Sequence, residues 1–215
     1  MSDTDMGKDI DMEQEPVRRG EMTSSEKNSE NRVTHPTAKK NILCMIVTTR
    51  CLSCVFECIR DRLKPDFNVK VVVTDTVAEA MTKEDKRCLA GIPYYRDSDE
   101  WDSWNSLGDE VLHIELRKWV DIMIVWNVDG QFLAKYSAGV CDDLALCVLR
   151  AWDPSKRYAL LLNMHPMMLN NVTTREVLSN LPKDVLVSKV DASSGRPKTA
   201  LQGAFASALR GLMRQ

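Results

Sequence analysis

A histidine in the middle of the chain has the surroundings of a residue that does chemistry. His113 lies near the start of a short amphipathic segment, VLHIELRKW, at residues 111–119. A buried-strand pattern follows directly over residues 120–126. Imidazoles titrate near neutral pH, and α/β proteins place reactive groups where strands and helices meet. The alternative interpretation is that His113 only caps or packs at the start of its helix.

Cys51 and Cys54 form a second candidate, a CxxC pair at an expected strand-to-helix turn. The start of a helix lowers the pKa of a thiol, which would favour thiol redox chemistry. However, CxxC spacing alone is a weak signal, and Cys58 continues the helical spacing. The favoured interpretation is that these cysteines are small buried apolar residues, with a thiol redox protein as a minor alternative. No metal site is expected, because no second CxxC or paired histidine occurs.

Composition limits the class of protein. The first 40 of the 215 residues hold nine acids and no apolar periodicity, which predicts a disordered acidic and polar tail. Residues 41–215 suffice for one domain. No apolar run approaches the ~20 residues of a membrane span, and a formal net charge of −2 gives no electrostatic case for nucleic acid. Seven cysteines, mostly in apolar segments, indicate a reduced, cytoplasmic protein.

Strand and helix patterns alternate along the domain. Strands are predicted over residues 41–48, 69–73, 92–95, 120–126, 158–163 and 185–190. Helices are predicted over residues 51–63, 76–81, 83–89, 97–104, 111–119, 129–138, 142–151, 173–181 and 198–213. The alternation predicts an α/β fold with a doubly wound parallel sheet. Ligands of such folds bind where the strands end, so the turns after the strands are the candidate positions.

The helix expected over residues 97–104 carries two tryptophans. Asp97 or Ser98 is its expected cap. Trp101 and Trp104 lie three residues apart, which predicts packing in the core or in an interface, with a stacking pair as the alternative.

Four segments together resemble a known enzyme family. They are DSDEWDSWNS (97–106), VLHIELRKW (111–119), LAKYSAGVCDDLALCVLRAWDPSK (133–156) and MMLNN (167–171). They resemble phosphopantothenoylcysteine decarboxylase, the flavin-dependent enzyme of coenzyme A biosynthesis, in a form close to the animal enzymes. The resemblance implies a three-layer, flavodoxin-like domain that forms trimers, with FMN and the active site at the subunit interface. It also implies phosphopantothenoylcysteine as substrate and His113 as the catalytic histidine that assists decarboxylation.

Other positions depart from the family pattern. His165 stands where the family has the asparagine that holds the substrate carboxylate, and Gln131 replaces an asparagine of a second segment. An imidazole lacks the paired donor and acceptor of an amide. No cysteine follows Cys147, so the family's proton-donating flap cysteine has no counterpart. His165 and Gln131 therefore remain only weak candidates for substrate binding.

The turn that would hold the flavin phosphate is also altered. The family has roughly TGS there, whereas this chain has Thr48-Thr49-Arg50. Glycine lets backbone N–H groups approach a phosphate closely, and Thr49 obstructs that approach. Arg50 and nearby hydroxyls would have to supply charge and hydrogen bonds instead. The weak candidates for FMN binding are Thr48, Thr49, Arg50, Ser53, Thr74 and Asp129.

Two functions follow from this mixture of retained and altered positions. The first is a phosphopantothenoylcysteine decarboxylase-like protein with lost catalytic groups, which forms a homotrimer or contributes His113 to a mixed trimer with an intact family member. The second is a catalytically inactive pseudoenzyme that keeps the fold and the trimer surface as a regulatory or interaction subunit.

Overall fold

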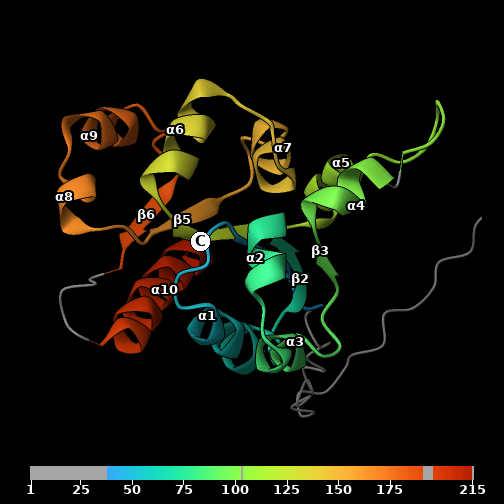
Figure 1. Ribbon diagram of the computed structural model, residues 1–215, viewed down its shortest axis with the longest axis horizontal. Coiled ribbons are helices and arrows are strands. Elements are labelled where there is room, and N and C mark those ends of the chain that lie inside the picture. Colours follow the sequence, from blue (N-terminus) through green and yellow to red (C-terminus); the bar gives the residue numbers. More distant parts are fainter. Residues whose placement is uncertain (1–37, 103, 191–195, 215) are drawn as a thin grey trace, which may run out of the picture. The chain divides into compact units, whose positions relative to one another are not determined.

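A parallel β-sheet forms the centre of the fold (Figure 1). The computed structural model describes residues 38–102, 104–190 and 196–214, and the sheet has six strands within them. The strands are β1 (Asn41–Ile46), β2 (Asn68–Val73), β3 (Tyr94–Tyr95), β4 (Ile122–Val128), β5 (Tyr158–Leu162) and β6 (Leu186–Lys189). They lie in the order β3-β2-β1-β4-β5-β6, and all five neighbouring pairs are parallel. This confirms the predicted doubly wound sheet, whose order reverses between β1 and β4.

The central strand β1 is apolar from Ile42 to Ile46 because helices cover both faces of the sheet. Ile42, Cys44 and Ile46 pack into the core on one face. Leu43 and Met45 pack into the core on the other face. A strand buried on both faces has no solvent side, which explains the continuous apolar run in place of an alternating pattern.

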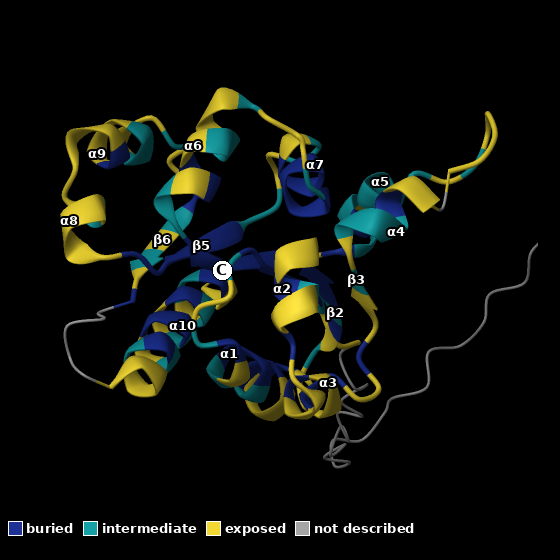
Figure 2. Cartoon of the chain, viewed as in Figure 1, coloured by how far each residue is buried: buried dark blue, intermediate teal, exposed yellow. Residues whose placement is uncertain are grey.

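Helices form a layer on each face of the sheet. The layer on the Ile42 side contains α1 (Leu52–Cys58), its π-helical continuation η1 (Ile59–Leu63), α2 (Asp75–Ala80), α3 (Lys83–Cys88) and α10 (Pro197–Met213). The opposite layer contains α5 (Leu112–Trp119), α6 (Gly130–Ala138), α7 (Leu144–Arg150) and α9 (Val172–Ser179). Figure 2 shows the buried sheet between helices whose outer faces are exposed. The predicted three-layer architecture is confirmed.

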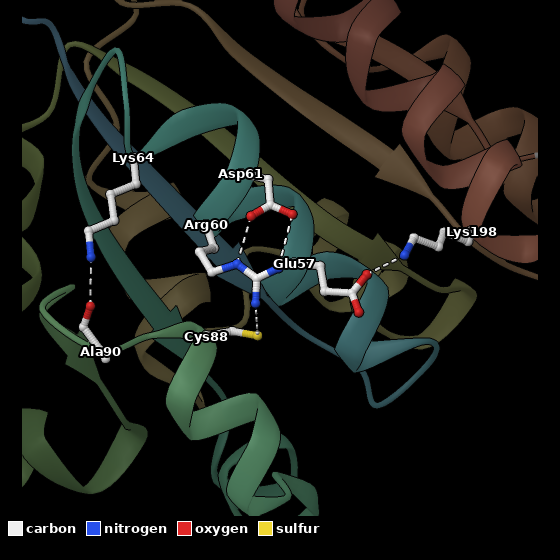
Figure 3. A network of polar contacts seen from close by, with 7 residues as sticks. All are labelled: Glu57, Arg60, Asp61, Lys64, Cys88, Ala90 and Lys198. Atoms are coloured by element: carbon white, nitrogen blue, oxygen red, sulfur yellow. Dashed lines mark hydrogen bonds and ion pairs between the residues drawn. The ribbon is translucent and has the colours of Figure 1, made fainter.

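Polar contacts fix α1 and η1 against the neighbouring helices of their layer (Figure 3). Glu57 of α1 pairs with Lys198 of α10, with 2.5 Å between carboxylate and ammonium. Arg60 of η1 donates to the Sγ of Cys88 in α3 at 3.3 Å. The η1 turn closes with a hydrogen bond from the Lys64 N–H to the Ile59 carbonyl, a five-residue spacing that marks a π-helical turn.

Most predicted elements are present, with ends that differ by a few residues. The four-residue helix α8 (Pro166–Leu169) was not predicted. The short helix α4 (Asp97–Asp102) carries Trp101, which is 65% exposed, and Trp104 after it is 50% exposed. The prediction that these tryptophans pack in the core is therefore wrong, whereas an interface role stays a prediction.

Residues 1–37 of the predicted tail lie outside the described residues. In the described part of the chain, no helix combines the length and the apolar character needed to cross a membrane.

Candidate functional site

A cavity of about 340 Å³ opens where β1, β2 and β4 end. This is the edge of the sheet where doubly wound folds bind ligands, beside the strand-order reversal. Five of the predicted site residues line it: Thr48, Thr49, Thr74, Gln131 and Asp129. The other lining residues are Val47, Thr76, Asp97, Phe132, Lys135, Asp142 and Asp143. The fold thus gathers most of the weak cofactor candidates and one of the two substrate candidates.

Four predicted residues do not line this cavity: Arg50, Ser53, His113 and His165. Arg50 is exposed at the turn that leads into α1, and Ser53 is exposed in the first turn of α1. His165 is exposed and caps α8, where its Nδ1 accepts a hydrogen bond from the Met167 N–H at 3.2 Å. The structure therefore assigns His165 a local structural contact, and its substrate role stays a prediction.

Asn127 holds the turn that borders the cavity. Its side-chain Nδ2 donates to the Arg50 carbonyl at 2.5 Å, and its own carbonyl accepts from the Thr48 hydroxyl at 2.9 Å. Its Oδ1 accepts from the Nδ2 of Asn163 at 3.0 Å, and both asparagines are buried. Buried polar groups that satisfy one another in this way specify a single arrangement. The ends of β4 and β5 thereby fix the loop after β1.

Sequence reasoning missed Asn127 although one signal was available. Its backbone has φ of 60°, a left-handed conformation that asparagine tolerates better than most residues. The register of β4 against β5 shifts between Val125 and Val128 at the same place. An asparagine near the end of an apolar strand is therefore a usable sign of a bulge or a sharp turn.

Asp97 joins two helix starts at the rim of the cavity. Its carboxylate accepts from the Asp75 N–H at 2.8 Å and from the Leu144 N–H at 3.0 Å. It therefore satisfies donors at the starts of α2 and α7. The predicted use of Asp97 as the cap of its own helix is wrong, because α4 begins at Asp97 and its side chain reaches across to these other elements.

Four of the five charged residues that line the cavity are aspartates. The pKa of Asp143 is raised to about 6, mainly by burial and also by the nearby charges of Asp97 and Asp142, against the Leu146 hydrogen bond that lowers it. Burial likewise raises the pKa of Asp97, against two backbone hydrogen bonds that lower it. Lys135 is the one basic side chain among the lining residues, and it pairs with Asp142 at 2.6 Å.

These residues do not fit the phosphate of FMN. The Thr48 hydroxyl already donates to Asn127, and the lining cation Lys135 is already paired. The turn also has the side chain of Thr49 where close backbone approach would require glycine. Phosphate sites rely on free N–H donors and unpaired cations. As for a metal, no cluster of ligand side chains suited to one occurs in the part of the chain that the structure describes.

His113 is held by a buried glutamate. Its Nδ1 lies 2.5 Å from Oε1 of Glu100, and its backbone N–H donates to Oε2 of the same carboxylate at 3.0 Å. The side chain of Glu100 is only 6% exposed, whereas that of His113 is 24% exposed. A carboxylate on Nδ1 fixes the orientation of an imidazole and leaves Nε2 as its second functional nitrogen. The pair joins α4 to the start of α5, and neither residue lines the cavity, although Asp97 in the same helix α4 does.

Cys51 and Cys54 are joined by a disulfide. Both are partly exposed, so the prediction that they are fully buried apolar residues is wrong, although Cys54 does pack against the core. The prediction of a fully reduced chain also fails at this pair. The reason is local: Cys51 belongs to the turn before α1 and stands outside the buried stripe that Leu52, Val55 and Phe56 form.

Comparison with known proteins places this chain in a family. A flavoprotein family model matches residues 30–201, which is most of the chain. The chain therefore belongs to the flavoprotein family, and the predicted resemblance to phosphopantothenoylcysteine decarboxylase is confirmed.

Individual relatives carry that name. A probable phosphopantothenoylcysteine decarboxylase of Arabidopsis thaliana is 47% identical over 87 residues, which are 40% of this chain and 43% of the relative. The phosphopantothenoylcysteine decarboxylase of Mus musculus is 35% identical over 117 residues, which are 54% of this chain and 55% of the relative. The matched stretches thus span about half the length of these relatives or less.

Solved structures match over a longer part of the chain. The FMN binding protein AtHal3 superimposes with a TM-score of 0.67 at 27% identity, covering 80% of this chain and 98% of that one. A mutant PPC decarboxylase complexed with pantothenoylaminoethenethiol gives a TM-score of 0.65 at 28% identity, with 79% and 98% covered. The fold is therefore kept over a wider range than the sequence similarity.

Proposed function

We propose that this protein is a divergent phosphopantothenoylcysteine decarboxylase-like subunit that contributes His113 to a mixed trimer with an intact family member. The observation that carries the proposal is the Glu100–His113 pair. The imidazole is oriented and partly exposed, yet it does not line the cavity of its own chain. A reactive group prepared in this way is suited to a cavity on a neighbouring subunit.

His113 would act on the carboxylate of phosphopantothenoylcysteine. With Nδ1 against Glu100, Nε2 is the nitrogen that would face the substrate and steer its decarboxylation. Gln131 and His165 would be at most minor contacts to the substrate. This chain holds no cysteine after Cys147, so the flap thiol of the family reaction has to come from the partner. Complete turnover by this chain alone is therefore not expected.

Flavin is the cofactor class that supports this assignment. Membership of the flavoprotein family and the likeness to the FMN binding protein AtHal3 both favour it. The Thr48 hydroxyl already donates to Asn127 and Lys135 is paired with Asp142, so we propose that the chain on its own binds FMN weakly. The visible absorption spectrum of the purified full-length protein tests this, because stoichiometric bound flavin would give a yellow protein and contradict the proposal.

Mixed assemblies test the role of His113. The full chain is co-expressed with the mouse decarboxylase in which the matching histidine is replaced by alanine, and release of carbon dioxide from phosphopantothenoylcysteine is measured. We expect activity with the wild-type chain and a loss of at least about 100-fold with His113→Ala, the usual scale for a general acid–base group. Glu115→Ala, on the same helix α5, is the matched control and should retain activity.

A pseudoenzyme that regulates or binds an intact relative is the second candidate. The acidic lining and the paired Lys135 favour it, because they leave the cavity poorly suited to a phosphate. The two candidates differ in one outcome. Mixed assemblies that form normally, but whose activity does not change with His113→Ala, would support the pseudoenzyme and contradict His113 donation.

A further inference from the structure

Cys51 and Cys54 differ from the buried cysteines of the chain. Their Cα atoms lie 5.5 Å apart, which is within the usual range for a disulfide, and both side chains are partly exposed. Burial raises the thiol pKa of the four buried cysteines: Cys44, Cys58, Cys88 and Cys147. The thiolate is the reactive form of cysteine, so these four are poor redox groups. The exposed Cys141 has no disulfide partner in the structure.

The pair lies next to the cavity through the backbone. Cys51 precedes α1 with φ of 49° and ψ of 44°, a left-handed conformation that costs a non-glycine residue about 1 kcal/mol. The residues just before it, Thr48 and Thr49, line the cavity. The carbonyl of Arg50, the residue adjoining Cys51, accepts the hydrogen bond from Asn127. A change in the conformation of Cys51 is therefore transmitted to this turn.

The far end of the same helix is anchored. Glu57 pairs with Lys198 of α10, and Arg60 contacts Cys88 of α3 (Figure 3). These contacts hold α1 and η1 on the sheet whatever the state of the two sulfurs. Any rearrangement on opening the disulfide is therefore confined to the turn over residues 48–54.

We propose that Cys51 and Cys54 form a reversible thiol–disulfide site that sets the shape of the cavity-bordering turn. The oxidant is a low-molecular-weight disulfide such as oxidised glutathione. One protein thiolate attacks the small disulfide and releases one glutathione thiolate, which leaves a mixed disulfide. The second protein thiolate then displaces the other glutathione, so that the protein dithiol loses two electrons and two glutathione thiols receive them with the two protons. The proposal is independent of flavin binding.

Alkylation after equilibration in glutathione buffers tests the chemistry. The full-length protein is held at graded ratios of reduced to oxidised glutathione, quenched with acid, labelled with N-ethylmaleimide under denaturing conditions and mapped by mass spectrometry. We expect labels at Cys51 and Cys54 to disappear together on oxidation and to return together on reduction. Cys54→Ser should abolish this paired change, whereas Cys141→Ser should keep it.

Two outcomes overturn the redox site. In one, both cysteines are labelled in every buffer. In the other, the pair remains unlabelled in excess reduced glutathione, which would make it a permanent structural disulfide.

Hydrogen exchange tests the coupling to the cavity. We expect amide exchange over residues 48–53 to rise by about tenfold on reduction, because that segment would open locally while the anchored end of α1 and η1 would not. Exchange over β1 and over residues 59–63 should stay the same. Equal exchange at residues 48–53 in the two redox states would contradict control of the turn by the disulfide.

Discussion

Glu100 and His113 make a two-point contact in which one buried carboxylate receives both the imidazole Nδ1 and the backbone N–H of the same residue. The contact sets both the ring orientation of His113 and the start of α5. Glu100 comes from α4, thirteen residues earlier in the chain. The histidine recognised by resemblance therefore has a specific structural partner in the DSDEWDSW segment.

Replacing Glu100 by alanine should destabilise the fold. The substitution leaves two donors of His113 without their acceptor in a largely buried place, which should cost about 1–3 kcal/mol. Urea denaturation of the purified protein measures the free energy of unfolding. Glu115→Ala is the control, because it removes only a partly exposed pair with Lys118 and should change stability by less than about 0.5 kcal/mol. Equal stability of the two variants would show that the Glu100 contact is not a structural one.

Replacing Asn127 by alanine should cost more than an ordinary surface change. It removes the donor to Arg50 and the acceptor for Asn163, and it places alanine at a positive φ. We expect a loss of about 2–4 kcal/mol in the free energy of unfolding. Asn105→Ala, in an exposed loop, should have little effect. If the Asn127 variant unfolds at the same urea concentration as the wild type, the network contributes no net stability.

The raised pKa of Asp143 predicts a specific pH dependence of stability. A carboxyl whose pKa in the folded protein is about 6, above its ordinary 3.8, holds its proton more tightly when folded. The contribution of Asp143 to the free energy of unfolding is therefore fully present below about pH 4 and is lost as the pH rises through 6. Asp97 and Asp142 reinforce this loss, whereas Lys135 opposes it.

Asp143→Asn isolates that contribution because asparagine can still accept the Leu146 N–H at the start of α7. Relative to the wild type, the variant should gain roughly 1–3 kcal/mol between pH 4 and pH 7, less where solvent screens the charge. Thermal or urea unfolding across this pH range gives the difference. A constant difference at all pH values would contradict a raised Asp143 pKa.

Replacing Thr49 by glycine should strengthen FMN binding if the turn obstructs the phosphate. The expected gain is about tenfold, since glycine allows closer backbone approach to an anion. Flavin fluorescence quenching measures the affinity. Riboflavin is the internal control, because it lacks the phosphate and its affinity should not change. A parallel gain for riboflavin would place the effect of Thr49 at the ring and not at the phosphate.

Sequence patterns predicted the sheet well because burial on both faces leaves a direct mark in β1 and β4. The candidate site was harder to predict. The Thr48–Arg50 turn was identified, but its shape depends on Asn127, and left-handed backbone conformations leave only a weak signal in sequence. The pairing of His113 with Glu100 joins two helices whose packing no local pattern encodes. The helix α8 is only four residues long, which is too short for a periodic pattern.

The hydrogen bonds of Asn127 to Arg50 and Asn163 have a consequence for the order of folding. Its partners lie 77 residues away at Arg50 and 36 residues away at Asn163. Contacts so distant along the chain form only after the intervening segments have been brought together. The turn beside the cavity cannot adopt its final shape before β4 has paired with β1 and β5 has paired with β4. A chain that stalls early in folding would therefore have its first strands and helices in place while still lacking this site.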